Sequence, residues 1–179
     1  MDYFKDIENM GENVINKLKS CGTGVRINPL AKIALPDRVD LGDHCRICDF
    51  VFIFAGKGVK IGCYTDIQPH VTFWGGGETI IGDRVSVGPG TVLLSAVYAH
   101  DEGLMMVDGL PEGSARALYG KLVIQNDVYI GANCTLMPEI IVGEGAILGA
   151  GSFANRDLDP WGIYAGSPAR KIGERKPLR

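Results

Sequence analysis

The sequence lacks the features of membrane, secreted and nucleic-acid-binding proteins. Its formal net charge is -3 over 179 residues, which argues against a broad basic face for nucleic acid. No apolar run approaches the roughly 18 residues of a membrane-spanning helix, and the opening MDYFKDIENM has no signal-peptide pattern. The five cysteines show no disulfide spacing, so we expect reduced thiols and a cytoplasmic protein.

Residues that bind metals are also few. Three histidines are present, His44, His70 and His100, and no two of them are closely spaced. Cys45 and Cys48 form a single C-x-x-C, without a second pair to complete four zinc ligands. We therefore expect packing roles for these two cysteines and no metal site.

Glycine, in contrast, is abundant. The chain has 25 glycines, about twice the usual share of roughly 7%. They are spread along the chain, and many follow an aliphatic residue, as in Leu41-Gly42 and Ile61-Gly62. Because glycine accepts backbone angles that other residues avoid, this spread predicts many tight turns.

Aliphatic residues recur at every sixth position along most of the chain. Three such hexads make one set, and the sets repeat every 20 residues before residue 98 and every 18 after residue 124. The fifth position of a hexad is small or β-branched, as in Cys45, Val71 and Ala146. The residues that lead the hexads are Cys21, Ile27, Ile33, Leu41, Ile47, Ile53, Ile61, Ile67, Phe73, Ile81, Val87, Leu93, Ile124, Ile130, Leu136, Val142, Leu148 and Ala154.

This period predicts an all-β fold, a parallel β-helix. The lead residue points into a narrow core, the fifth residue fills the space near a corner, and the residues between them turn the chain. Three short strands close one coil, and coils stack as parallel ladders about 4.8 Å apart. An α/β domain would need amphipathic stretches of ten or more residues between its strands, and residues 21–98 contain none.

The segment before the repeat predicts a helix. Over residues 2–19, Phe4, Ile7, Val14 and Leu18 share one face among charged neighbours. We expect this helix to cover the lower end of the β-helix, whose strand edges would otherwise be open. It defines a cap over residues 1–20.

A second segment interrupts the repeat. Residues 99–121 form an excursion loop that opens with His100 and carries Arg116. A loop of this length in a compact repeat is usually functional. The β-helix domain then spans residues 21–173, followed by a basic tail over residues 174–179.

Three stretches carry a resemblance to a known family. They are IGDRVSVGPGTV, VYIGANCTLMPEIIVGEGAILGAGSFANRDL and YAGSPARKI. The chain resembles the hexapeptide-repeat acyltransferases, in the branch that acetylates sugars, nucleotide-linked amino sugars and small xenobiotics. The resemblance covers residues 21–173 and implies a left-handed coil, a homotrimer with sites between subunits, and acetyl-CoA as the co-substrate. In some relatives the N-terminal segment also helps to shape the acceptor site.

The resemblance assigns catalytic roles at the start of the excursion loop. It places the general base at His100, since histidine is largely neutral near pH 7 and suits proton abstraction. The family often has proline after this histidine, whereas this chain has Asp101. Asp101 or Glu102 is then a candidate to orient the imidazole.

Contacts with CoA follow from the resemblance in the same way. Two turns of small residues are expected to hold the pantetheine arm and to offer backbone N–H groups to the oxyanion, namely Gly131-Ala132-Asn133 and Gly149-Ala150-Gly151. The closing loop with Ser167 and Pro168 is expected near the adenine. Arg170 or Lys171 would meet a phosphate. A solvated basic tail is the alternative for these two cations.

Acceptor contacts are expected from His70, Trp74 and Arg116. The glycines at 75–77 would wall the pocket beside Trp74, although a looser corner is an alternative account of that run. For His70, as for His44, an exposed position on a turn is the competing interpretation.

The predicted activity is acetyl transfer from acetyl-CoA to a hydroxyl or amine of a sugar, by direct attack in a ternary complex. A sugar destined for surface polysaccharide, in free or nucleotide-linked form, is the expected acceptor. Two alternatives stay open. One is a zinc enzyme similar to the γ-class carbonic anhydrases, which needs three converging histidines. The other is a non-catalytic β-helix scaffold.

Overall fold

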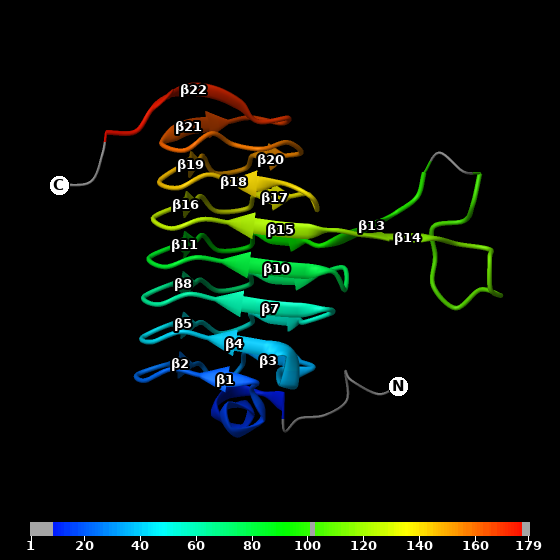
Figure 1. The fold of residues 1–179 in the computed structure, drawn as a ribbon, viewed down its shortest axis with the longest axis horizontal. Coiled ribbons are helices and arrows are strands. Elements are labelled where there is room, and N and C mark those ends of the chain that lie inside the picture. Colours follow the sequence, from blue (N-terminus) through cyan, green and yellow to red (C-terminus); the bar gives the residue numbers. More distant parts are fainter. Residues whose placement is uncertain (1–8, 101–102, 177–179) are drawn as a thin grey trace.

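The computed structural model describes residues 9–100 and 103–176, which form a parallel β-helix with three faces (Figure 1). The first sheet contains β1 (Ser20–Cys21), β4 (Val39–Leu41), β7 (Gly58–Ile61), β10 (Glu78–Ile81), β15 (Lys121–Ile124) and β18 (Ile141–Val142). The second contains β2 (Arg26–Ile27), β5 (Arg46–Ile47), β8 (Asp66–Ile67), β11 (Ser86–Val87), β16 (Tyr129–Ile130), β19 (Ile147–Leu148), β21 (Gly162–Ala165) and β22 (Arg170–Glu174). The third contains β3 (Lys32–Ala34), β6 (Phe52–Phe54), β9 (Thr72–Trp74), β12 (Val92–Leu94), β17 (Thr135–Leu136) and β20 (Phe153–Ala154).

The coil is left-handed, as predicted. In Figure 1 the near strands β7 and β10 run from right to left, and the chain then passes behind them while it rises towards the C-terminal end. This path is the reverse of the usual right-handed crossover between parallel strands. We call the turns between the first and second sheets the first corner, those between the second and third sheets the second corner, and those that return to the first sheet the third corner.

The predicted hexad register is confirmed by the ladders. In the first sheet, Ile61 pairs with Leu41 on one side and Ile81 on the other. Every predicted lead residue from Ile27 to the last coil is at most 3% exposed, because it points into the core that the three sheets share. Cys21 alone among the predicted leads is exposed, since β1 is the terminal strand of its sheet.

The turns between the strands use left-handed backbone. His44 and His70 have φ of 57° and 63°, and Asn133 has φ of 55°. All three occupy the fourth hexad position and are exposed on the outside of a corner. Short polar or glycine residues suit such angles best, so aromatic rings here need other support.

The two ends of the β-helix are covered differently. At the lower end the described part of the predicted cap is a 3-10 helix, η2 (Gly11–Lys17), which buries Val14. Leu18 follows it and packs against the core, while Phe4 and Ile7 lie outside the described residues. A short 3-10 turn, η3 (Pro36–Arg38), sits beside it in the first coil. At the upper end β22 folds back antiparallel on β21.

The excursion loop leaves the body of the prism. It starts and ends in an antiparallel hairpin of β13 (Ala96–Tyr98) and β14 (Ala117–Tyr119), and in Figure 1 it projects to the side of the stacked coils. The hairpin springs from the third corner, directly after β12. No helix in the described part of the chain is long and apolar enough to span a bilayer.

Candidate functional site

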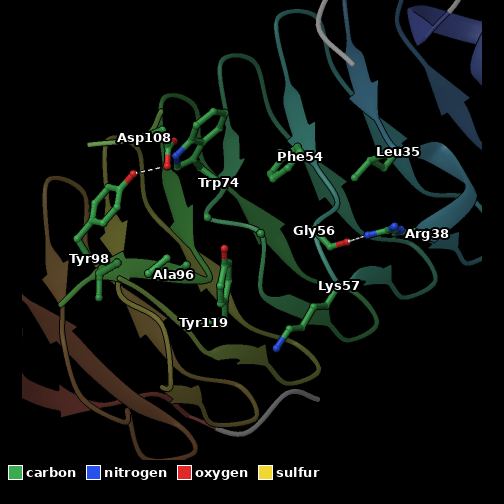
Figure 2. Close-up of a pocket in the computed structure, with 14 residues that line it drawn as sticks. Leu35, Arg38, Phe54, Gly56, Lys57, Trp74, Ala96, Tyr98, Asp108 and Tyr119 are labelled. Carbon is green, nitrogen blue, oxygen red and sulfur yellow. Dashed lines mark hydrogen bonds between the residues drawn. The ribbon is translucent and has the colours of Figure 1, made fainter. Parts of the chain in front are cut away.

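A cavity of about 520 Å³ lies at the third corner, between the lower coils and the hairpin (Figure 2). Four aromatic rings line it, those of Phe54, Trp74, Tyr98 and Tyr119. Its charged lining residues are Arg38, Lys57 and Asp108, and backbone at Gly56, Gly75 and Gly76 forms part of its wall. A concave, largely aromatic site with a few polar groups is typical of a small-molecule site.

The predicted glycine run forms a tight corner and not a loose one. A Cβ on Gly77 would lie 2.1 Å from the carbonyl oxygen of Ser95, and one on Gly75 would lie 2.4 Å from the backbone nitrogen of Ala96. Gly76 has φ of 77°, and a Cβ there would meet the rings of Phe54 and Tyr119 at 3.4 Å each. The run therefore lets neighbouring coils and two rings approach closely, and Gly75 and Gly76 line the cavity beside Trp74.

Trp74 anchors the aromatic side of the cavity. Its ring centroid is 5.7 Å from that of Phe54 and 6.0 Å from that of Phe52, in tilted geometry. The side chain is still 45% exposed, so its face is open towards the cavity and solvent. Phe54 was missed from the sequence, although it holds the same hexad position as Trp74 one coil below, directly after a lead residue.

The polar groups of the cavity divide between the loop and the lower coils. In the loop, the Tyr98 hydroxyl donates a hydrogen bond to the carboxylate of Asp108, and this bond raises the pKa of Tyr98 above its ordinary value. In the lower coils, Arg38 donates to the carbonyl oxygen of Gly56 at 2.6 Å. The Lys57 ammonium lies 5.4 Å from the centroid of the Tyr119 ring. Nothing in the hexad pattern marked Arg38, Lys57 or Asp108, because none of them occupies a core position.

The three histidines stand on three different corners. His44 stacks on Tyr64 at the first corner, with ring centroids 5.0 Å apart. His70 stacks on Phe50 at the second corner, outside the cavity. His100 is exposed at the base of the excursion loop, directly after Ala99, whose N–H bonds the carbonyl oxygen of Arg116. Three histidines so placed do not converge within one chain.

Other predicted site residues lie around the base of the loop. Asp101 and Glu102 fall outside the described residues. Arg116 is exposed next to Ala117, which lines the cavity, but Arg116 is not itself a lining residue. Among the residues that the structure describes, no group of three histidine, cysteine or acidic side chains is arranged to hold a metal ion.

The second corner offers backbone donors in the upper coils. The third hexad position of these turns is proline at Pro29, Pro69 and Pro89, which has no N–H to donate, and Asp49 in the second coil. It is alanine, with a free N–H position, at Ala132 and Ala150. Towards residues 9–100 and 103–176, the N–H groups of these two alanines donate no hydrogen bond.

At the first corner several of the equivalent N–H groups are satisfied by side chains. The N–H of Cys63 donates to Asp83 at 2.7 Å, that of Asp83 to Asn126 at 2.8 Å, and that of Glu144 to Gln125 at 2.9 Å. Side chains thus cap this N–H in several turns of the first corner, whereas none caps it at Ala132 or Ala150 within the described residues. Open donors on a turn of small residues are a ready site for ligand carbonyl oxygens.

The other N–H groups of the two turns predicted to bind CoA form hydrogen bonds between neighbouring coils. The N–H groups of Gly131, Asn133, Gly149 and Gly151 bond carbonyl oxygens of neighbouring coils at 2.7 to 2.8 Å. Of the two turns named from the sequence, Ala132 and Ala150 are therefore the members whose N–H groups stay available. The glycines allow close stacking, since a Cβ on Gly131 would lie 2.5 Å from the nitrogen of Ala150.

The two cations of the closing loop that were predicted to bind phosphate differ in their partners. Lys171 is paired with Asp159 at 3.3 Å and with Glu174 at 2.7 Å, and Glu174 in particular raises its pKa. Arg170 is exposed and bonds only its neighbour's carbonyl, that of Ala169, within the described chain. Ser167 and Pro168 are exposed beside it. Arg170 is thus the freer of the two cations.

Arg175, the first basic residue after this loop, is not part of a fully solvated tail, which was the alternative. Arg175 donates to the carbonyl oxygens of Asp127 at 2.6 Å and Gly145 at 3.0 Å. Its guanidinium also lies 5.8 Å from the ring centroid of Trp161. The chain is therefore held against the first corner at Arg175.

Three of the cysteines, Cys45, Cys48 and Cys134, pack in the core. Cys45 is buried, and its thiol donates to the carbonyl oxygens of Gly62 at 2.9 Å and Gly42 at 3.1 Å. Burial raises its pKa to about 11, so the reactive thiolate is disfavoured. Cys48 is also buried, and all five cysteines are free thiols.

Comparison with known proteins agrees with this architecture. The family model for bacterial transferase hexapeptide (six repeats) matches residues 121–155. The dTDP-4-amino-4,6-dideoxy-D-glucose acyltransferase of Escherichia coli is 28% identical over 158 residues, covering 88% of this chain and 82% of the relative. A chloramphenicol acetyltransferase of Klebsiella aerogenes is 45% identical over a shorter stretch of 56 residues, 31% of this chain and 27% of the relative.

A solved structure shares the fold along most of its length. AntD, an N-acyltransferase from Bacillus cereus in complex with dTDP and 3-hydroxybutyryl-CoA, has a TM-score of 0.84 and 31% identity. The match covers 89% of this chain and 84% of AntD. The shared repeat, the shared fold and this degree of identity establish that the chain is an acyltransferase and belongs to the hexapeptide-repeat acyltransferase family.

Proposed function

We propose that the enzyme transfers an acyl group from a CoA thioester to the amino group of a nucleotide-linked amino sugar. The observation that carries this proposal is the likeness to AntD, an N-acyltransferase solved with dTDP and an acyl-CoA, over 89% of the chain. The E. coli relative is named for a dTDP-linked amino sugar as well. These two relatives favour an amine over a hydroxyl, a choice that the sequence left open. Acetyl remains the acyl group proposed from the sequence.

The second corner supports the donor half of the reaction. The open N–H groups of Ala132 and Ala150 stand one coil apart, where coils are stacked about 4.8 Å from one another. An extended pantetheine arm carries amide carbonyls along its length and ends in the thioester, so two such donors suit it. Arg170, above them in the closing loop, is then the candidate partner for a CoA phosphate, with Ser167 and Pro168 near the adenine.

The cavity at the third corner supports the acceptor half. Trp74 and the rings around it offer flat apolar faces to a sugar or base, while Arg116 stands at its margin. His70 lies on the preceding corner, and its stacking on Phe50 supports a structural role there.

His100 is the proposed general base. The acceptor amine attacks the thioester carbonyl carbon, a C–N bond forms, and the C–S bond breaks. An ammonium acceptor gives up two protons over the whole reaction, one retained on the CoA thiol and one released to water. A base at the mouth of the excursion loop would take the proton from the attacking nitrogen, and such a group typically contributes about 10²–10⁴-fold. Asp101 or Glu102 is proposed to orient it.

We further propose that the enzyme is a homotrimer. Met105, Met106 and Val107 in the excursion loop are each more than half exposed, with 62%, 55% and 51% of their surface accessible. A projecting loop with consecutive exposed apolar side chains suits burial against another copy of the chain. Such contact would bring His100 of one subunit to the CoA groove of another. We also propose a cytoplasmic location, which the free thiols suit. The product is proposed to be used in surface polysaccharide.

The test is release of the CoA thiol from acetyl-CoA with a panel of sugars, amino sugars and their dTDP-linked forms. We expect turnover with a dTDP-linked amino sugar and not with the matching hydroxyl sugar. His100→Ala should lower kcat by about 10²-fold or more. His44→Ala is the matched control, since His44 is an exposed histidine at another corner, and it should keep full activity. No turnover with any amine acceptor would overturn the proposal, and full activity of His100→Ala would remove the base from it.

A further inference from the structure

We propose that the cavity at the third corner is polarised to bind a zwitterionic acceptor in one direction. Arg38 and Lys57 at one end hold its diphosphate, and Asp108 at the other end holds its ammonium group. This inference rests on the proposed function and names the residues that select and orient the acceptor.

The cationic end belongs to the lower coils. Arg38 ends η3, and Lys57 directly precedes β7, so both come from the rigid first and second sets of the repeat. The bond from Arg38 to Gly56, at 2.6 Å, fixes the guanidinium beside the residue that precedes Lys57. Within the described lining, these are the two cations of the cavity. A fixed guanidinium with an adjacent ammonium is a strong arrangement for phosphate oxygens.

The anionic end belongs to the excursion loop. Asp108 is the carboxylate among the described lining residues, and the Tyr98 hydroxyl fastens it to β13. Figure 2 shows Asp108 and Arg38 on opposite sides of the cavity, with Trp74 between them. A carboxylate held in this way attracts an ammonium group and offers no comparable gain to a hydroxyl. The loop therefore carries the preference for an amine.

The aromatic wall fits the part of the acceptor that joins the two charges. Trp74, Phe54 and Tyr119 are placed between the charged ends, and a pyranose ring presents C–H groups that pack on such faces. A ligand with a diphosphate at one end of the sugar and an amine further round the ring matches this order of groups. A free amino sugar would engage the anionic end alone.

CoA also contains a diphosphate, so the anion at Arg38 and Lys57 has two sources. The geometry favours the acceptor. The open donors proposed for the pantetheine arm lie at the second corner in the upper coils, whereas Arg38 and Lys57 lie at the third corner in the lower coils. The binding experiment separates the two by using dTDP and CoA as independent probes.

Calorimetric titration of the whole protein with dTDP, without any sugar or acyl donor, tests the cationic end. Lys57→Ala should weaken dTDP binding by about tenfold and leave CoA binding within twofold. Lys60→Ala is the matched control. Lys60 lines a neighbouring groove that Arg38 and Lys57 also border, but it does not line this cavity, so the variant should bind dTDP as the parent does. Weaker CoA binding by Lys57→Ala with unchanged dTDP binding would assign the anion to CoA and overturn the proposal.

Steady-state kinetics with a dTDP-linked amino sugar test the anionic end. Asp108→Asn should raise the acceptor KM by about tenfold while dTDP, which has no amine, binds unchanged. Tyr98→Phe keeps the carboxylate but removes its tether, so it should raise KM less than Asp108→Asn does. Loss of dTDP binding in Asp108→Asn, or an unchanged KM, would contradict the assignment. Binding of dTDP requires no turnover. If the acyltransferase proposal fails, the enzyme shows no turnover, whereas the effect of Lys57→Ala on dTDP binding can still be measured.

Discussion

The imidazole of His70 lies parallel to the phenyl ring of Phe50, with ring centroids 4.8 Å apart and planes inclined by 6°. Both residues occupy the fourth hexad position with left-handed backbone, so they stack along the second corner from one coil to the next. Trp74, only four residues after His70, lines the cavity at the third corner. The short strand β9, which ends at Trp74, thus carries the chain from one corner to the next and places apart two residues that the sequence had grouped together.

This separation predicts different effects of two substitutions. Trp74→Ala should raise the acceptor KM by about tenfold, because it removes the largest apolar face of the cavity. His70→Ala should change kcat/KM by less than about threefold and cost at most about 1 kcal/mol of unfolding free energy, since the ring is exposed. Steady-state kinetics with urea unfolding of both variants provide the comparison. A large KM change in His70→Ala alone would return His70 to the acceptor site.

The tight third corner predicts that Gly77 is required for stability. An alanine Cβ at this position would lie 2.1 Å from a backbone oxygen of Ser95 and 2.3 Å from that of Gly120, so coils would have to move apart. Gly77→Ala should therefore cost about 2 kcal/mol or more of unfolding free energy. Gly58→Ala is the matched control in a neighbouring coil, where the nearest atom lies 3.9 Å from the added Cβ. Equal unfolding midpoints for the two variants would show that the corner is loose after all.

The ladder between Arg46 and Asp66 predicts a pH-dependent contribution to stability. The Arg46 guanidinium donates to both Asp66 oxygens at 2.7 Å, and these hydrogen bonds lower the pKa of the Asp66 carboxyl. A lowered folded-state pKa means that the stabilisation is complete above the unfolded pKa near 3.9 and is lost as pH falls through the folded value. Because Arg46 is 54% exposed, the pair is worth only about 0.5–1 kcal/mol.

Urea unfolding of the parent and Asp66→Asn at several pH values measures this contribution. The parent should be the more stable at pH 7 by that small margin, and the difference should shrink as pH falls below about 4. Arg46→Gln removes the other partner and should give the same pH trend. A difference that grew on acidification would contradict the lowered pKa.

The fold was predictable because the repeated aliphatic residues can be buried only in the core of the β-helix. A lead residue such as Ile61 has its partners, Leu41 and Ile81, at fixed distances in the chain, so sequence spacing and spatial register are the same quantity. The left hand of the coil was not contained in the spacing and came from family resemblance. The N-terminal cap was placed at the correct end, but periodicity did not distinguish a 3-10 helix from an α-helix over so short a span.

The site was predictable only where it touched the repeat. Trp74 was named because a run of glycines follows it, and it does line the cavity, as does Phe54 at the same hexad position one coil below. Asp108 comes from a loop outside the hexad pattern, and its bond to Tyr98 depends on how the hairpin closes. Either Arg170 or Lys171 was expected to meet a phosphate, and the sequence could not choose between them. The pairing of Lys171 with Asp159 and Glu174 depends on β22 folding back, which no local pattern signalled.

The open N–H of Ala132 can be removed without disturbing the fold, so its role in binding acetyl-CoA can be tested directly. Ala132→Pro removes this donor, and the same turn position already carries proline in the sequences Gln68-Pro69 and Gly88-Pro89 of lower coils. The substitution should therefore change the unfolding free energy by less than about 1 kcal/mol. If the donor binds a pantetheine amide, the KM for acetyl-CoA should rise by about tenfold with kcat almost unchanged. If it binds the oxyanion, kcat should fall by about 10²–10³-fold instead.

Pro89→Ala is the reciprocal control, since it alters the turn below without removing a donor, and it should match the parent. A stable Ala132→Pro variant with unchanged kcat and KM would show that the thioester lies elsewhere than the second corner.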